Sequence, residues 1–141
     1  MKITCLLGSP RPDGNSATLA KHFCSTAEKV GATVQTFSLN TLHYKGCQGC
    51  MACKTKMDKC ILQDDLTQVL ESVGQCDVLV MATPVYMAEM TSPLRAFSGG
   101  TRTRERGRGS LLRPSIRGRS LAPALPVAAI NPYRNSGGKE G

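Results

Sequence analysis

The fold is decided by the stretch KITCLLGSPRPDGNS at residues 2–16, an apolar run that ends in a loop of glycine, proline and polar residues. An unbroken apolar run of this length is typical of a parallel strand that is buried on both faces. The apolar residues of 16–29 recur at helical spacing, and Gly31 ends that pattern. Residues 33–39 are rich in β-branched and aromatic residues, which predicts a second strand. Residues 2–39 are therefore expected to form one strand–helix–strand unit with a right-handed crossover.

The same alternation continues after a cysteine-rich loop at residues 40–63. Apolar residues at helical spacing over 66–73 follow an acidic helix start and end at Gly74. Residues 77–82 predict a third buried strand, and residues 92–97 predict a short helix. This order of elements predicts an α/β fold with a doubly wound, open and mostly parallel sheet, truncated at about three strands.

The composition of the chain changes abruptly near residue 97. Residues 1–97 carry nine basic and eight acidic side chains, whereas residues 98–141 carry nine basic side chains, eight of them arginine, and two acidic ones. Glycine and proline supply twelve of these last 44 residues, and two prolines interrupt the apolar stretch 121–130. We therefore expect residues 98–141 to form a largely disordered basic tail, which contacts nucleic acid only nonspecifically. The abrupt change also suggests the hypothesis of a reading-frame error or a fusion.

No targeting segment and no membrane contact are expected. The first apolar run is too short for a signal peptide and far too short to span a bilayer. Seven cysteines, an odd number, fit a reduced cytoplasmic protein better than a fully bridged secreted one. The expected location is therefore cytoplasmic.

Four cysteines lie on one loop with the spacing C-x2-C-x2-C-x6-C, namely Cys47, Cys50, Cys53 and Cys60. Closely spaced thiolates on a pliable loop are what an iron–sulfur cluster needs, and nearby lysines offset its negative charge. Tetrahedral zinc fits the same ligand count, and reactive thiols without metal are a third interpretation. The other cysteines are expected to be structural: Cys5, Cys24 and Cys76.

The loop at residues 8–16 has the chemistry of an anion site, although it matches neither a GxGxxG fingerprint nor a Walker A motif. The helix start that follows offers N–H groups and a positive dipole end. Ser9, Asn15 and Ser16 add neutral donors, and Arg11 adds a charged fork. The alternative is an ordinary strand-to-helix loop in which Ser16 caps the helix.

Residues 83–90 follow the third strand and flank the same crevice, because open α/β sheets bind ligands beyond the carboxyl ends of their strands. This second loop offers an apolar and aromatic wall to a flat heterocycle. The residues of the wall are Thr83, Pro84, Val85, Tyr86 and Met87. The alternative is a simple turn with a partly exposed tyrosine.

Taken together, these segments resemble the iron–sulfur flavoproteins within the NADPH-dependent FMN reductase group of flavodoxin-like proteins. The resemblance covers about residues 1–97 and rests on the loop 8–16, on GCQGCMAC at 46–53, on Cys60 and on TPVY at 83–86. It implies that the FMN phosphate binds Ser9, Arg11, Asn15 and Ser16, and that the flavin ring lies against residues 83–87. It also implies a 4Fe–4S cluster on Cys47, Cys50, Cys53 and Cys60.

The resemblance implies an FMN-dependent oxidoreductase that passes electrons between FMN and the cluster, with NAD(P)H or ferredoxin as electron donor. No catalytic side chain is required, because the cofactor carries the reaction. The resemblance further implies a homo-oligomer in which the cluster of one subunit faces the flavin of another. Two alternatives stay open: a cluster-free NAD(P)H-dependent FMN or quinone reductase, and an inactive truncated fragment with a polyanion-binding tail.

The chain also departs from the common pattern of this group. Ala88 stands where its members commonly have glycine. The fourth and fifth strands of a flavodoxin-like domain have no counterpart in the sequence pattern, so the third strand is expected at an exposed edge of the sheet.

Overall fold

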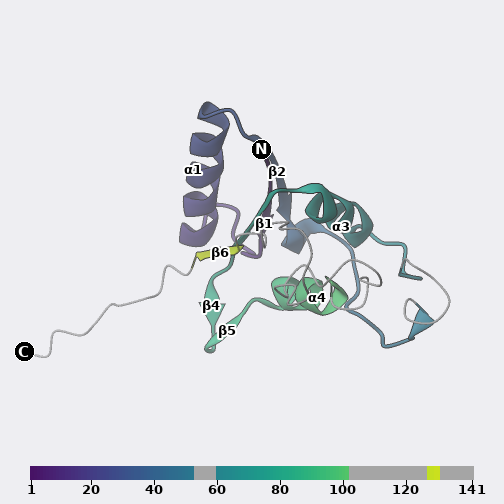
Figure 1. The fold of residues 1–141 in the computed structure, drawn as a ribbon. Helices are drawn as coiled ribbons and strands as arrows, with labels where there is room; N and C mark the ends of the chain where they lie inside the picture. Colours follow the sequence, from purple (N-terminus) through teal and green to yellow (C-terminus); the bar gives the residue numbers. More distant parts are fainter. Residues whose placement is uncertain (53–59, 102–126, 131–141) are drawn as a thin grey trace, which may run out of the picture.

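The computed structural model describes residues 1–52, 60–101 and 127–130 of the chain (Figure 1). The elements in chain order are β1 (Lys2–Leu7), α1 (Asn15–Lys29), β2 (Thr33–Ser38), the 3-10 helix η1 (Leu39–Thr41), α3 (Leu66–Gln75), β3 (Val78–Ala82), β4 (Val85–Tyr86), β5 (Glu89–Met90), α4 (Ser92–Thr101) and β6 (Val127–Ile130). Strands and helices alternate as predicted. Helix α4 runs past the predicted end at residue 97, and the β4–β5 hairpin and β6 are additions to the prediction.

The main sheet is parallel, with the strand order β2-β1-β3-β6. Strand β1 lies between β2 and β3, so that Ile3 is opposite both Val34 and Val78. The chain therefore leaves β1 toward one side of the sheet and later returns to its other side. This reversal places a topological switch point between β1 and β3, where ligands of such folds bind.

Strand β6 corrects one expectation. It pairs in parallel with β3, with Leu79 opposite Val127 and Ala82 opposite Ile130, so β3 has a neighbour on each side rather than an open edge. The sequence predicts coil here because Pro126 interrupts the apolar stretch, but a proline before the first residue of a strand removes no ladder hydrogen bond. The rest of the tail, residues 102–126 and 131–141, lies outside the described residues, as do the disorder and the nucleic-acid contact expected of it.

Helices cover both faces of the sheet, with α1 on one face and α3 and α4 on the other (Figure 1). The side chains of β1 alternate between two apolar clusters. Ile3, Cys5 and Leu7 pack with residues of α1, whereas Leu6 packs with residues of α3 and α4. Burial on both faces explains the unbroken apolar run that decided the fold prediction.

The cysteines outside the cysteine-rich loop have structural positions, as predicted. Cys5 on β1 and Cys24 on α1 are buried in the same apolar cluster. Burial raises the pKa of the Cys5 thiol, and the neighbouring Cys24 raises it further. Cys76 is half-buried, and its Sγ donates a hydrogen bond of 3.2 Å to the carbonyl oxygen of Val73.

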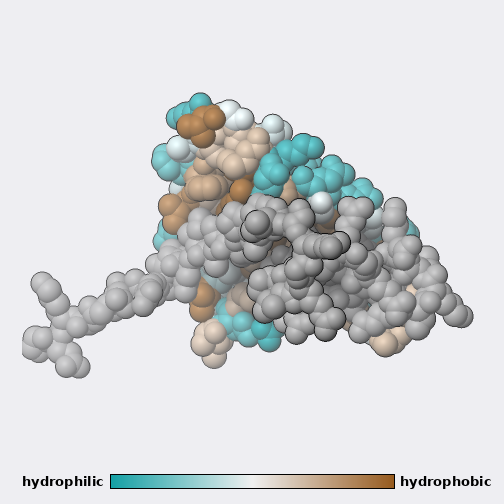
Figure 2. Space-filling view, viewed as in Figure 1, coloured by the Kyte–Doolittle hydropathy of each residue, from teal (hydrophilic) through white to brown (hydrophobic). Residues whose placement is uncertain are grey.

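Apolar side chains also reach the surface of α1 (Figure 2). Leu19, Phe23 and Val30, at or just beyond this helix, are exposed, whereas Ala20 and Ala27 of the same helix are buried against the sheet. Helix α1 is therefore apolar on more than the side that packs on the sheet. Among the described residues, none of the helices has the length and the apolar character needed to cross a membrane.

Candidate functional site

A cavity of about 420 Å³ lies between the loops that follow β1 and β3, at the topological switch point. Its lining includes six of the nine residues predicted to bind a ligand: Ser9, Arg11, Asn15, Ser16, Pro84 and Tyr86. The other three predicted residues, Thr83, Val85 and Met87, are outside this lining. Three residues of the first loop complete it without having been singled out from the sequence: Pro12, Asp13 and Gly14.

Ser9 shapes the first loop from inside. Its buried hydroxyl donates to the carbonyl oxygen of Arg11 at 2.9 Å and accepts from the backbone N–H of Arg11 at 3.1 Å. The backbone N–H of Gly14 donates to the same Arg11 carbonyl oxygen at 3.2 Å. The hydroxyl of Ser9 thus holds a tight turn at the edge of the cavity, and a Cβ on Gly14 would lie only 3.2 Å from that hydroxyl oxygen.

The start of α1 lies at the cavity and is open to a ligand. The N-cap is Gly14 rather than Ser16, and no side chain of the described residues caps the helix there. Ser16 is instead a buried residue of the first turn. The expectation that Ser16 is the N-cap is therefore wrong, and the first N–H groups of α1 keep their capacity to bind an anion.

The charges around the first loop favour an anion by a narrow margin. Arg11 is exposed and lines the cavity. Asp13 also lines it, but its Oδ1 lies 3.2 Å from Nζ of Lys21, and Lys21 donates a second hydrogen bond of 2.7 Å to the carbonyl oxygen of Pro12. Because Lys21 neutralises Asp13, Arg11 remains as the excess positive charge beside the uncapped helix start.

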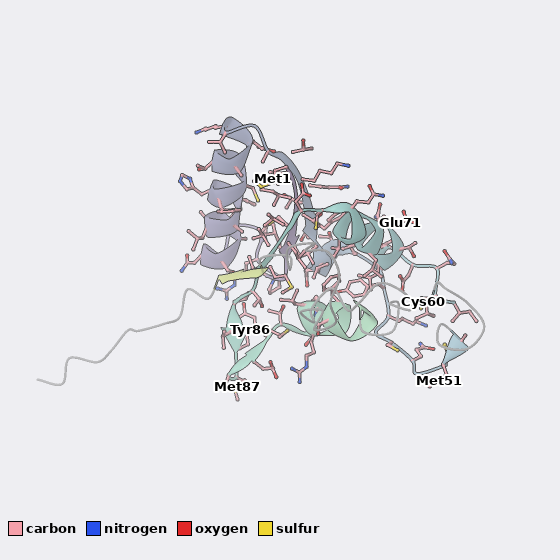
Figure 3. The ribbon with its side chains drawn as sticks, viewed as in Figure 1. Met1, Met51, Cys60, Glu71, Tyr86 and Met87 are labelled. Atoms are coloured by element: carbon pink, nitrogen blue, oxygen red, sulfur yellow. The ribbon has the colours of Figure 1, made fainter. Side chains whose placement is uncertain are left out.

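The second loop forms a small hairpin, which the sequence pattern does not predict. Tyr86 on β4 is opposite Glu89 on β5, and Met87 and Ala88 between them have φ values of 50° and 63°. Positive φ at both central residues is the geometry of a type I′ turn. Figure 3 shows Met87 at the tip of this hairpin, with Tyr86 above it. The side chain of Met87 is 98% exposed, and Tyr86 lines the cavity.

Two aspartates close the neck of the cysteine-rich loop. The backbone N–H of His43 donates to Oδ2 of Asp65 at 2.7 Å, and that of Lys45 donates to Oδ2 of Asp64 at 3.3 Å. Tyr44 lies between them and is half-buried; burial, and then the negative charge of Asp64, raises its pKa to about 12. These contacts bring the two ends of the loop together, beside a second cavity of about 510 Å³ that residues of the neck line.

The cysteines of this loop are less completely described. Cys47 and Cys50 are exposed and Cys60 is half-buried, while Cys53 lies outside the described residues. The backbone N–H of Gly49 donates to Sγ of Cys47 at 3.4 Å. Among the residues that the structure describes, no three His, Cys, Asp or Glu side chains are gathered as a metal site. The cysteines that are described do not by themselves form the expected four-thiolate site, so the cluster stays a prediction.

The sequence matches one protein-family model, that of the NADPH-dependent FMN reductases, over residues 1–104. The chain belongs to this family. An iron–sulfur flavoprotein of Methanocaldococcus jannaschii is 28% identical to this reductase-family chain over 102 residues, which are 72% of this chain and 52% of that protein. An iron–sulfur flavoprotein of Archaeoglobus fulgidus is 30% identical over 131 residues, which are 93% of this chain and 61% of that protein.

The solved structures agree on the fold. An NAD(P)H:quinone oxidoreductase from Methanothermobacter marburgensis has a TM-score of 0.60 at 16% identity, over 74% of this chain and 54% of that one. This likeness, with the parallel sheet and its helices, confirms the flavodoxin-like fold. The Archaeoglobus match reaches past residue 97, so it lends no support to the hypothesis of a reading-frame error or a fusion there. The chain spans about half the length of the curated relatives that it matches.

Proposed function

We propose that this member of the NADPH-dependent FMN reductase family is an FMN-binding oxidoreductase. The observation that carries the proposal is the cavity at the switch point, because it joins an anion-binding loop to an aromatic wall. In this proposal, the phosphate site consists of Ser9, Arg11, Asn15, Ser16 and the first N–H groups of α1. Pro84 and Tyr86 lie against the flavin ring, together with the neighbouring Thr83, Val85 and Met87.

The residues present suit this ligand in size and in chemistry. A cavity of about 420 Å³ is of the order of a mononucleotide site. Pro84 is buried and rigid, and Tyr86 is 46% exposed, which leaves its ring available for stacking on a heterocycle. When bound, FMN supplies hydride and one-electron chemistry, while the protein binds it, orients it and tunes its potential. NAD(P)H is the proposed electron donor, and ferredoxin is the alternative donor.

The iron–sulfur part of the proposal places a 4Fe–4S cluster on Cys47, Cys50, Cys53 and Cys60. Its support is the spacing of the cysteines and the names of the relatives, which are iron–sulfur flavoproteins. The N–H of Gly49 that donates to Sγ of Cys47 is also the kind of contact that stabilises a thiolate. Clustered reduced cysteines further favour a cytoplasmic location. The proposed flavin site does not depend on the cluster.

The arrangement of one chain also supports a homo-oligomer. Figure 3 shows Cys60 and Met51 of the cysteine-rich loop on one side of α4, and Tyr86 and Met87 of the hairpin on the other side. Electron exchange between two such centres is most direct when the loop of one subunit approaches the flavin of another. We therefore include the oligomer in the proposal.

The flavin site is tested by titrating FMN and riboflavin into the full chain, with flavin fluorescence as the readout. The expected result is that FMN binds more tightly than riboflavin, and that Arg11→Met lowers the affinity for FMN about tenfold while it changes riboflavin binding little. Lys29→Met, at the far end of α1, is the matched control for charge. Equal affinity of the two flavins, or no effect of Arg11→Met, would contradict the phosphate site.

A cluster-free NAD(P)H-dependent FMN or quinone reductase is the second candidate function. It is favoured by one observation, namely that the family model matching residues 1–104 is that of the NADPH-dependent FMN reductases, a description that names no cluster. Iron and acid-labile sulfide analysis of anaerobically purified protein separates the two functions. Stoichiometric flavin with about four iron atoms per chain supports the iron–sulfur flavoprotein, whereas stoichiometric flavin without iron supports the cluster-free reductase.

A further inference from the structure

We propose that Thr91 is a positioning residue, which holds the phosphate loop at a fixed place relative to the loop against the flavin ring. This inference rests on the proposed function and concerns a residue outside the lining of the cavity. Thr91 lies between β5 and α4 and is only 4% exposed. Its buried position indicates that its polar atoms serve other parts of the protein rather than solvent.

The polar atoms of Thr91 connect the two loops. Its hydroxyl Oγ1 donates to the carbonyl oxygen of Gly8 at 2.7 Å, across 83 residues of sequence. Its backbone N–H donates to Oγ1 of Thr83 at 3.2 Å, and that hydroxyl donates in turn to the carbonyl oxygen of Pro84 at 2.9 Å. One buried residue thus contacts the first residue of the phosphate loop and the first residue of the second loop.

Gly8 is adapted to this close approach. Its N–H donates to the carbonyl oxygen of Ala82 at 2.8 Å, which extends the pairing of β1 with β3 by one residue. A Cβ at Gly8 would lie 2.9 Å from Oγ1 of Thr91 and 3.2 Å from Cβ of Leu94, and both distances are shorter than ordinary contacts of a Cβ. The position of Ser9 and of the turn after it therefore follows from the contact between Gly8 and Thr91.

The contact between Thr91 and Gly8 affects the binding of the FMN phosphate and of the flavin ring to different extents. The phosphate binds at the first loop and the start of α1, whereas the ring binds at the second loop. Tight binding of the whole ligand therefore requires that the two loops keep a fixed position relative to each other. Riboflavin has the same ring and no phosphate. Removal of the Thr91 hydroxyl leaves the buried carbonyl of Gly8 without this donor, which costs enough to let the first loop move. FMN binding is then weakened more than riboflavin binding.

The test compares the dissociation constants of FMN and riboflavin for the full-length wild type, Thr91→Val and Thr91→Ser. The expected result is that Thr91→Val lowers the preference for FMN over riboflavin about tenfold, and that Thr91→Ser, which keeps the hydroxyl, restores the preference to within about twofold. Thr91→Ala is measured beside Thr91→Val, so that the result does not depend on one variant folding.

The matched control is Thr67→Val. Oγ1 of Thr67 is also buried, but it has no hydrogen-bond partner among the described residues. This variant therefore removes a buried hydroxyl without breaking a hydrogen bond to a described residue. Its preference for FMN should equal that of the wild type. An unchanged preference in Thr91→Val and Thr91→Ala, or equal losses for both flavins, would overturn the role of Thr91. A wild type that shows no preference for FMN overturns the proposed function itself, and the role of Thr91 with it.

Discussion

The hydroxyl of Tyr44 donates a hydrogen bond of 2.5 Å to the carbonyl oxygen of Pro93. This contact joins the neck of the cysteine-rich loop to the first turn of α4. Thr91, two residues before Pro93, bonds to Gly8 in the phosphate loop. The cysteine-rich loop, the second loop and the phosphate loop are therefore connected by short hydrogen bonds that meet at the start of one helix.

Replacement of Tyr44 by phenylalanine should lower the free energy of unfolding by about 1–2 kcal/mol, because the partly buried hydrogen bond from its hydroxyl to the Pro93 carbonyl is lost. Hydrogen exchange should show the same change locally, with faster exchange of the backbone N–H groups of His43 and Lys45. Tyr86→Phe is the control, since the Tyr86 hydroxyl has no hydrogen bond to another described residue and the stability should stay unchanged. Equal stabilities of Tyr44→Phe and wild type would contradict this role for the contact.

The pKa of Tyr44 is raised to about 12, which leads to a second prediction, on how the free energy of unfolding depends on pH. An unfolded tyrosine ionises near its ordinary value of about 10, so between these two values the folded protein binds more protons than the unfolded protein. The contribution of Tyr44 is therefore complete below about pH 10 and is lost as the pH rises toward 12.

Urea denaturation at several alkaline pH values checks this loss. The difference in unfolding free energy between wild type and Tyr44→Phe should shrink as the pH rises through this window. The other titrating groups are common to both proteins and cancel in the difference. A difference that stays constant up to pH values near 12 would mean that Tyr44 ionises equally easily in the folded and unfolded chains.

Much of the sheet was predictable because its signals are local. The apolar run of β1 and the helical spacing of α1 gave bounds that the structure reproduces within one residue. Gly74 was a less reliable signal: it was expected to end the helix, yet α3 continues to Gln75, because a glycine without positive φ is tolerated in the last turn. Strand β6 was missed because its pairing with β3 is a contact across about fifty residues, which no local pattern reveals.

The candidate site was predictable in part for the same reason. The phosphate loop and the TPVY segment contain turn and donor residues that signal a ligand site from their positions after strands. Asp13 carries no signal of its own as part of the lining, and its neutralisation depends on the Lys21 side chain, which reaches from the second turn of α1 to the loop. Thr91 has no signal at all in the sequence, because its importance comes from a contact with Gly8 that only the tertiary structure creates.

The hairpin between β4 and β5 contains a strained turn that substitution should relieve. Ala88 has a φ of 63°, a left-handed conformation that costs a residue with a Cβ about 1–2 kcal/mol. Ala88→Gly should therefore stabilise the protein by roughly 1 kcal/mol, after the greater flexibility of unfolded glycine is subtracted. Thermal and chemical unfolding measure the effect.

The control is the same substitution at Ala96, inside α4. It should destabilise the protein, because alanine has a higher helix propensity than glycine. Destabilisation by both substitutions would show that the turn at Ala88 is not strained.

The ion pair of Lys21 with Asp13 makes the last prediction, which concerns FMN binding. Without the ammonium group, the Asp13 carboxylate lies unneutralised in the lining of the cavity, beside the place proposed for the phosphate. Lys21→Met should then weaken FMN binding about two- to threefold at low salt, because both partners are exposed and such pairs act weakly. About 0.5 M salt should remove most of the difference, since it screens exposed charges over a few ångströms. Riboflavin, which lacks the phosphate, should bind the variant and the wild type equally.

The control variant is Lys29→Met. It removes the same charge from the other end of α1, where Lys29 forms no ion pair with a described residue, and it should leave both affinities unchanged. A loss for FMN that persists at high salt, or an equal loss in Lys29→Met, would show that Lys21 does not act by neutralising Asp13.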